Sequence, residues 1–286
     1  MAKGKIDTQT IGLDTGLAFA RWLTGKEHLH YGLWTGLEPI AANVGAAQAA
    51  YSDRLLALLP AQTGLRILDI GGGAGETAKR LLAAGHSVEI VVPSAYLAAR
   101  CRVNAPKAIV HECRFEDLQA TTLFDVCLFS ESFQYIALKI SLQKAQSLLM
   151  PGGAIVIGDC FRSDGFNRVG NRAVVGGGHN LQKFRDVLAA EPLETLSEED
   201  VTEAVAPSVE LEQALFNVIG LGLSGAAREM AAKRPWQNWL LQRGLGVFLS
   251  ARSKERLSQR FFETSRSKDM FCKSNRYLLL KIVKRA

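Results

Sequence analysis

The residues best suited to chemistry lie in a short segment in which Asp69 is followed by glycines at every second position, Gly71, Gly73 and Gly75. An apolar run precedes this segment and a helical pattern follows it, so the expected order is strand, glycine turn and helix. Glycines let a ligand approach the backbone where a Cβ would collide, and the helix directs free N–H groups toward that ligand. The segment therefore predicts the nucleotide-binding corner of an α/β sheet.

The spacing of the glycines separates two classes of nucleotide cofactor. In the motif of dinucleotide enzymes the third glycine would fall at position 76, which is Glu76 in this chain. An acid in the turn repels a pyrophosphate but attracts the cationic end of S-adenosylmethionine (SAM). The turn therefore favours SAM and disfavours a NAD-dependent oxidoreductase.

Strand and helix patterns alternate from Leu65 onward, and these elements must position the turn. Strands are predicted at 65–70, 87–92, 108–113, 124–130 and 154–159, with helices at 76–84, 95–104 and 138–149. This alternation predicts a parallel sheet covered by helices on both faces. Upstream, residues 11–60 have a largely helical pattern that Pro60 ends.

After Asp159 the pattern loosens. Residues 162–178 are rich in Gly, Asn and Arg and predict a loop, and Asn180 is suited to cap a helix that runs to about residue 190. A strand near 193–202, helices at 209–223, 226–232 and 236–262 and a closing strand at 276–284 are expected next. A helical block between two late strands is an insertion, and we expect it over the active site.

These elements divide the chain into four expected regions. They are an N-terminal helical lid (1–60), a SAM-binding core (61–205), a helical cap insertion (206–270) and a final strand that returns to the core sheet (271–286).

Length and composition fit a globular enzyme. The 286 residues can bury one large core, or a core and a cap, and 48% hydrophobic with 22% charged residues is ordinary for a soluble protein. The first ten residues are polar, and no apolar run reaches the roughly 20 residues that cross a bilayer. The five cysteines form no C-x-x-C pair and fit reduced core positions. We therefore expect a cytoplasmic protein.

The positive charge is concentrated near the C-terminus. Residues 251–286 hold eleven Lys/Arg and three Asp/Glu, a net charge of +8, so the remainder of this +6 chain carries −2. Such a face either is simply solvated or attracts anionic lipids, acidic substrates or nucleic acid.

Four sequence pieces, the glycine turn among them, carry a family resemblance: LDIGGGAG (68–75), FDVCLFSESFQYI (124–136), LLMPGG with IVIGD (148–159), and HLHYGLW (28–34). Together they resemble the class I SAM-dependent methyltransferases. The last piece is similar to the tocopherol, sarcosine/dimethylglycine and geranyl-diphosphate methyltransferases, which act on small or lipophilic metabolites. The resemblance implies a Rossmann-like, doubly wound, seven-stranded and mostly parallel sheet with an antiparallel last strand.

The same resemblance implies where SAM binds. Asp69, Gly71, Gly73 and Gly75 match the loop that holds its amino acid end, although Asp69 is also suited to a helix cap or a buried ion pair. Two further residues, Ser130 and Glu131, match the end of the fourth strand beside the sulfonium, or else form a polar pair that faces solvent.

Two positions depart from the general pattern of the group. An acidic residue usually ends the second strand and holds the ribose, but Val92 stands here, and Ser94 or a backbone group would have to serve instead. In the loop after the third strand Arg114 replaces an Asp near the adenine, with Glu116 nearby. Phe115 is suited either to stack on adenine or to fill the core.

Methyl transfer is an in-line displacement, so the enzyme mainly aligns the two partners and excludes water. A general base is needed only where the acceptor must lose a proton. The candidates are His30, Tyr31, Tyr135 and His179, each of which also suits a structural role. His28 alternates with His30, but no carboxylate or cysteine partner has a suitable spacing, and no metal is expected.

The leading hypothesis is a SAM-dependent methyltransferase that acts on a small, lipophilic metabolite at O, N or C. Apolar stripes in 211–221 and 236–249 favour a lipophilic acceptor or simply form core, and the basic stretch 252–273 would suit an anionic membrane surface. The alternatives are an atypical group transfer from SAM, as in quinone modification, reduced activity, or a non-catalytic binding protein with a basic membrane- or nucleic-acid-facing tail. No nucleic acid is expected, because the segment after the fourth strand lacks N-P-P-Y.

Overall fold

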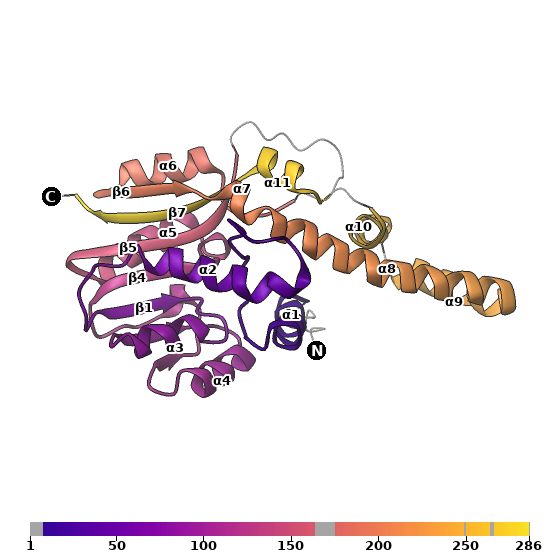
Figure 1. Ribbon diagram of the computed structural model, residues 1–286, viewed down its shortest axis with the longest axis horizontal. Coiled ribbons are helices and arrows are strands. Elements are labelled where there is room, and N and C mark those ends of the chain that lie inside the picture. The colour runs from indigo at the N-terminus through magenta and orange to yellow at the C-terminus, as the bar shows by residue number, and fades with distance from the viewer. Residues whose placement is uncertain (1–7, 164–174, 249, 264–265, 286) are drawn as a thin grey trace.

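The computed structural model describes residues 8–163, 175–248, 250–263 and 266–285 (Figure 1). At the centre of this described part is a seven-stranded sheet with the order β3-β2-β1-β4-β5-β7-β6. The strands are β1 (Arg66–Ile70), β2 (Ser87–Val91), β3 (Ile109–His111), β4 (Phe124–Ser130), β5 (Leu149–Arg162), β6 (Leu193–Asp200) and β7 (Asn275–Lys284). Neighbouring strands from β3 to β5 are parallel, and β7 runs antiparallel to both β5 and β6. The predicted Rossmann-like, mostly parallel sheet is confirmed.

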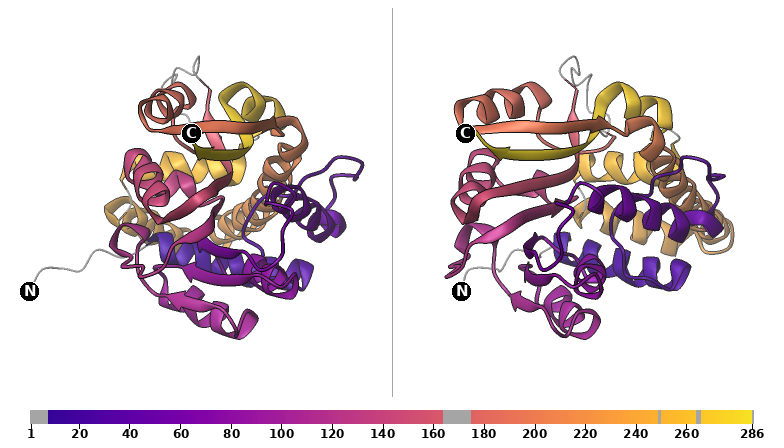
Figure 2. Two further views of the ribbon diagram at one scale, coloured as in Figure 1. Left: turned by 90° about the vertical axis from the view of Figure 1, so that its left-hand side faces the viewer. Right: turned by 60° about the vertical axis from the view of Figure 1, so that its left-hand side comes forward.

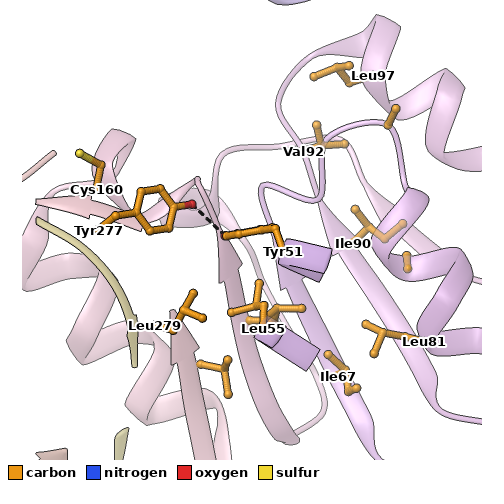
Figure 3. Close-up of a cluster of buried hydrophobic side chains, with 14 of the residues drawn as sticks. Tyr51, Leu55, Ile67, Leu81, Ile90, Val92, Leu97, Cys160, Tyr277 and Leu279 are labelled. Carbon is orange, nitrogen blue, oxygen red and sulfur yellow. Dashed lines mark hydrogen bonds between the residues drawn. The ribbon is translucent and has the colours of Figure 1, made fainter. Parts of the chain in front are cut away.

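Helices cover both faces of the sheet. The first face carries α2 (Val44–Leu56), α3 (Glu76–Ala83) and α4 (Ala95–Asn104), and the second carries α5 (Leu138–Leu148) and α6 (Leu181–Ala190). Because side chains alternate along a strand, Ile67 of β1 joins the first core and Leu68 the second. The first core includes Tyr51 of α2 and Tyr277 of β7, whose rings meet above the sheet (Figure 3).

The remaining elements lie at the two ends of the chain and between the strands. They are α1 (Thr8–Thr24), α7 (Thr202–Val205), α8 (Pro207–Lys233), α9 (Pro235–Phe248), α10 (Ala251–Phe262), α11 (Lys268–Ser274) and three short 3-10 helices, η1 (Ala41–Asn43), η2 (Phe115–Asp117) and η3 (Phe133–Tyr135).

The predicted breaks in the late helices were wrong. The glycines at 222 and 225 do not interrupt α8, because a single glycine costs a helix only about 1 kcal/mol. The helix expected over 236–262 is instead two helices, since Ser250 caps α10 by accepting a hydrogen bond from the Ser253 N–H at 3.1 Å. The third strand is shorter than expected, α11 was not anticipated, and most of the predicted loop 162–178 lies outside the described residues.

The inner part of the helical insertion packs against the N-terminal segment. The Ser208 hydroxyl in the first turn of α8 accepts hydrogen bonds from the Gly32 N–H at 3.1 Å and from Trp34 Nε1 at 2.8 Å, in the segment that carries HLHYGLW. The outer half of α8 and α9 project away from the body (Figures 1 and 2). The outer half of α8 and α9 thus form an arm; a cap over the active site and the boundaries of the four expected regions stay predictions.

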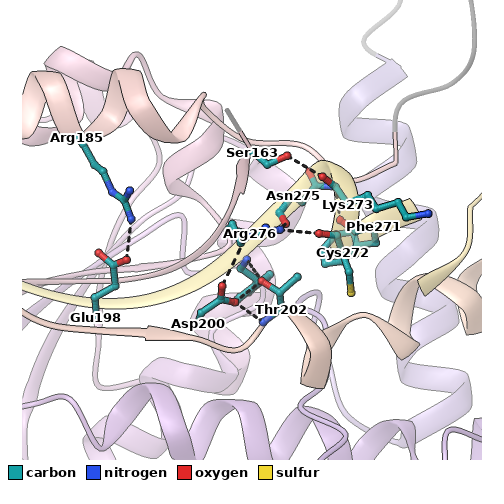
Figure 4. A network of polar contacts seen from close by, with 11 residues as sticks. Ser163, Arg185, Glu198, Asp200, Thr202, Phe271, Cys272, Lys273, Asn275 and Arg276 are labelled. Atoms are coloured by element: carbon teal, nitrogen blue, oxygen red, sulfur yellow. Dashed lines mark hydrogen bonds and ion pairs between the residues drawn. The ribbon is translucent and has the colours of Figure 1, made fainter. Parts of the chain in front are cut away.

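A polar network fixes the junction of β6, β7 and α11 (Figure 4). Asp200 accepts a hydrogen bond from the Thr202 N–H at 2.9 Å and lies 3.7 Å from the Arg276 guanidinium. Arg276 Nη1 also donates to the carbonyl oxygens of Cys272 and Asn275, at 2.6 and 2.7 Å. This junction anchors the inner end of the insertion to the sheet.

All five cysteines are free thiols, and Cys101, Cys127 and Cys160 are buried, whereas Cys113 and Cys272 are only half-buried. Within the described part of the chain, no helix combines the length and the apolarity that a membrane crossing requires.

Candidate active site

A cavity of about 560 Å³ opens at the carboxyl ends of β1, β2 and β4, the edge at which open α/β sheets bind ligands. Its wall combines the glycine turn after β1, the segment after β2, η2, the end of β4 and residues 27–30 of the N-terminal segment. The structure therefore brings together most of the residues predicted to bind the cofactor: Asp69, Gly71, Gly73, Ser94, Phe115, Glu116, Ser130 and Glu131 all line this cavity.

The turn after β1 requires glycine for conformational reasons. Gly71, Gly73 and Gly75 have φ angles of 73°, 55° and 86°, all in the left-handed region. The chain doubles back tightly, since the Gly73 N–H donates to the Gly71 carbonyl at 2.7 Å and the Gly75 N–H to the Gly72 carbonyl at 2.9 Å. Gly75 does not line the cavity; it begins α3 and packs against Cys101.

Gly71 offers a test of how the turn is built. A Cβ there would collide with the Cβ of Ser132, whereas a Cβ at Gly85, which also has a positive φ of 85°, would meet nothing within 4 Å. We expect Gly71→Ala to lower the free energy of unfolding by roughly 2–4 kcal/mol and Gly85→Ala by only about 1–2 kcal/mol, the cost of the backbone alone. Chemical denaturation of both variants checks this. Equal losses of free energy of unfolding would show that Ser132 moves aside at little cost.

Asp69 is the most unusual group in the cavity. It is fully buried, and neither carboxylate oxygen has a hydrogen-bond partner among the described residues. Burial raises the pKa of this carboxyl to about 7. A Cβ at Gly72 would lie 2.6 Å from Oδ2 of Asp69, so this fourth residue of the turn, which the sequence reasoning did not single out, must also be glycine. An unpaired carboxylate in a ligand-sized cavity is suited to a cation, and the ammonium group of SAM fits it.

Glu131 ends β4 in a strained conformation, with the positive φ of 54° that non-glycine residues rarely adopt. Its Oε1 accepts a hydrogen bond from the Tyr31 N–H at 2.7 Å and another from the Tyr277 hydroxyl at 2.8 Å. The Tyr277 oxygen also lies 3.0 Å from that of Tyr51. Burial raises the pKa of Glu131 to about 8. Strain supported by two hydrogen bonds is typical of a functional position.

The sequence reasoning missed Tyr277 and Tyr51, although both belong to this network. Tyr277 lies 146 residues from Glu131, and only the pairing of β7 with β5 brings them together. An aromatic residue in an apolar strand carries no sign that its hydroxyl has a polar partner, so no local signal could have identified it.

The histidines near the cavity do not have the surroundings of a general base. His30 is buried, with Nδ1 2.8 Å from the Tyr31 carbonyl and Nε2 3.0 Å from Nδ1 of His28, and burial lowers its pKa to about 3. His30 is therefore neutral at physiological pH. It lines the cavity, as does His28, which the sequence reasoning considered only as a metal ligand. No group of His, Cys, Asp or Glu suited to a metal occurs within the described ranges.

Two other catalytic candidates are displaced from the cavity. His179 does not line it, because Nε2 lies 3.1 and 3.0 Å from the carbonyls of Phe133 and Ile136 and supports η3. The Tyr31 side chain is also outside the lining and packs edge-on against Phe271, so Tyr31 contributes its backbone N–H to Glu131 instead. Tyr135 lines the mouth and is exposed.

The cofactor-binding candidates away from the turn have mixed roles. Ser94 caps α4, accepting a hydrogen bond from the Leu97 N–H at 3.3 Å, and Phe115 is buried edge-on against Phe129. Arg114 also lines the cavity. Another carboxylate, Glu27, also lines it and pairs with Arg100 at 2.7 Å, which fastens the N-terminal segment to α4. The second strand ends without a carboxylate, as the sequence indicates.

The sequence is similar to known proteins. Residues 45–261 match the family described as "Methyltransferase domain". The 27-O-demethylrifamycin SV methyltransferase of Amycolatopsis mediterranei (strain S699) is 31% identical over 201 residues, which cover 64% of this chain and 72% of that protein.

Two solved structures share the fold at low sequence identity. The [4+2]-cyclase SpnF aligns with a TM-score of 0.66 at 16% identity, over 97% of this chain and 94% of its own. The geranyl diphosphate C-methyltransferase from Streptomyces coelicolor A3(2), solved with S-adenosyl-L-homocysteine, has a TM-score of 0.62 at 15% identity, over 99% and 100% of the two chains. At such identity these likenesses establish the fold alone.

Proposed function

Since the chain belongs to the methyltransferase domain family and is a SAM-dependent methyltransferase of the small-molecule kind, we propose that it methylates a small, lipophilic metabolite at an oxygen, nitrogen or carbon atom. The observation that carries the proposal is the unpaired Asp69 carboxylate beside the glycine turn, in a cavity large enough for a nucleoside. Peripheral contact with a membrane through the basic C-terminal region is part of the same proposal, because an acceptor of this kind dissolves in lipid.

The proposal assigns the lining residues to the parts of SAM. Asp69 and the turn Gly71–Gly73 would hold the amino acid end, Phe115 and Glu116 would face the adenine, and Ser130 with Glu131 would lie beside the sulfonium. Bound SAM supplies an electrophilic methyl group. The chain's own residues orient the partners and exclude water, and Glu131 is placed to accept a proton from an acceptor that must lose one.

A lipophilic acceptor is supported by the rest of the wall. The apolar residues that line the cavity include Leu29, Ile70, Leu97 and Ile136. An atypical group transfer from SAM is the alternative, favoured by one observation: Val92 and Arg114 stand where relatives hold the ribose and adenine with acids.

The test is binding and transfer by the purified chain. Calorimetry with SAM and with S-adenosylhomocysteine is expected to give dissociation constants in the micromolar range, about −8 kcal/mol. Incubation of SAM labelled in its methyl group with phenolic and prenyl acceptors should move the label into an organic-extractable product. Failure to bind either nucleoside would overturn the proposal. Binding with consumption of SAM, but with the methyl label absent from the acceptor product, would favour the atypical transfer.

A further inference from the structure

The outer arm, which we define as residues 218–233 of α8 together with α9, exposes an unusual amount of apolar surface. The outer half of α8 runs away from the body, and α9 lies against it at the outer end (Figure 1). Its exposed apolar side chains are Val218, Ile219, Leu221, Leu223, Trp236, Trp239, Leu240 and Leu241. Contiguous exposed apolar surface on a soluble protein marks a site of interaction.

α10 covers only one side of α8. Gly220 packs directly against the Phe261 carbonyl, the rings of Phe216 and Phe261 lie 5.5 Å apart, and Gln213 Nε2 donates to the Arg260 carbonyl at 2.9 Å. Residues three to four positions apart share a helix face, so this contact uses the row 213–216–220. Val218 and Leu221, each 68% exposed, are left uncovered.

The end of the arm has the composition of an interfacial helix. Trp236, Trp239 and Leu240 stand three and four positions apart on α9 and are 65%, 55% and 51% exposed. The guanidinium of Arg243 lies over the Trp239 ring at 4.7 Å from its centroid. Tryptophan beside basic residues is typical of helices that lie in the headgroup region of a bilayer.

The end of the outer arm and α10 together form a basic region. Residues 224–262 contain eight Lys/Arg and two Asp/Glu, a net charge of +6, which equals the +6 of the entire chain, so the rest sums to zero. Arg228, Arg234 and Arg243 make no ion pair with any residue that the structure describes. These cations remain available for an external anion.

The basic residues nearer the C-terminus are used internally instead. Arg266 pairs with Glu212, Lys268 lies 3.1 Å from Glu203, and Arg276 serves the junction of β6, β7 and α11 (Figure 4). The part of the basic region that can bind a partner is therefore the outer arm rather than the stretch 252–273, in which Arg260 also pairs with Glu212.

We propose that the outer arm binds the surface of an anionic lipid bilayer, with α9 lying in the headgroup region and Trp236, Trp239 and Leu240 turned toward the acyl chains. Basic residues near such a surface contribute about 1 kcal/mol each. A second copy of the chain is a poorer occupant, because two copies of the +6 region 224–262 repel one another.

α8 connects the outer arm to the wall of the cavity. The first turn of α8 contacts Gly32 and Trp34, and the neighbouring Tyr31 N–H holds Glu131. Delivery of a lipid-dissolved acceptor rests on the proposed function, whereas binding to vesicles is measurable without any methyl transfer.

The test uses sedimentation of the full chain with vesicles of phosphatidylcholine alone and of phosphatidylcholine with phosphatidylglycerol. We expect binding to the anionic vesicles only. The double variant Trp236→Ser/Trp239→Ser and the triple variant Arg228→Gln/Arg234→Gln/Arg243→Gln should each lower the apparent affinity at least about 10-fold. Trp22→Ser, which removes a 78% exposed tryptophan of α1 outside the arm, is the matched control and should bind as the wild type does.

Three results would overturn the proposal. The first is a wild-type chain that does not bind anionic vesicles, and the second is an equal loss of vesicle affinity in the Trp22→Ser control. The third is a dimer in ultracentrifugation that the arm variants convert to a monomer, which would identify a second copy as the occupant. Calorimetry with SAM on the same variants keeps the two proposals separable, because the arm variants are expected to bind SAM normally.

Discussion

Replacing Asp69 with asparagine is expected to lower the affinity for SAM about 100-fold and, at the same time, to stabilise the unliganded protein. The carboxylate is fully buried, and both oxygens lack partners among the described residues. It therefore lowers the free energy of unfolding of the unliganded protein, and a bound ammonium group offsets this loss. Loss of one partner of a buried charge pair costs about 2–5 kcal/mol of binding. Asparagine keeps the shape but removes the charge.

The pH dependence of this effect has a definite sign. Burial raises the pKa of Asp69 to about 7 from 3.8, so between those values the folded chain holds a proton that the unfolded chain has lost. The contribution of Asp69 to stability is therefore largest below about pH 4 and falls as the pH rises toward 7. The affinity for SAM should rise over the upper part of that range, because the ammonium prefers the ionised carboxylate.

Calorimetry with SAM and thermal unfolding at pH 8 check both effects. The asparagine variant should bind SAM far more weakly. Its unfolding temperature should rise by about 2–4 °C for each 1 kcal/mol gained in the free energy of unfolding. Asp53→Asn, which changes an exposed carboxylate of α2 paired with Arg80, is the control and should alter neither quantity appreciably. Retention of wild-type affinity by Asp69→Asn would remove the observation that carries the proposed function.

The second large effect is expected at Glu131. Replacement by glutamine should lower the rate of methyl transfer to a proton-bearing acceptor about 100-fold, the contribution typical of a general base. The amide oxygen of glutamine can still accept the hydrogen bonds from Tyr31 and Tyr277, so the fold is expected to survive. Tyr277→Phe should cost about 10-fold, because Tyr277 is a positioning residue that acts through Glu131.

The pH profile separates catalysis from structure at this position. Because burial raises the pKa of Glu131 to about 8, the carboxylate form predominates only above that pH, and kcat/KM of the wild type should rise through about pH 8. The glutamine variant should lack this rise. Glu89→Gln is the control: this half-buried carboxylate pairs with His111 at 2.6 Å and does not line the cavity. An unchanged rate and profile in Glu131→Gln would leave Glu131 with a structural role only.

Local signals made much of the fold predictable. The parallel strands follow from apolar runs and the turn from its glycines, and both depend on residues within a few positions of one another. Asp69 could be identified for the same reason, because it stands at a fixed place between strand and turn. Prediction failed where the local signal is weak. A break was expected between residues 223 and 226, but α8 is continuous there, and Gly220 of the same helix packs against α10.

The sequence by itself determined the strand, glycine turn and helix at which we propose that the cofactor binds, since these elements are adjacent in the chain and are set by backbone conformation. Only the tertiary structure decided what surrounds these elements. Glu131 meets Tyr277 because β7 returns beside β5, His30 is neutral because the fold buries it, and the outer half of α8 projects away from the body together with α9. Burial and contacts between distant segments depend on the whole chain at once, and no short stretch of sequence encodes them.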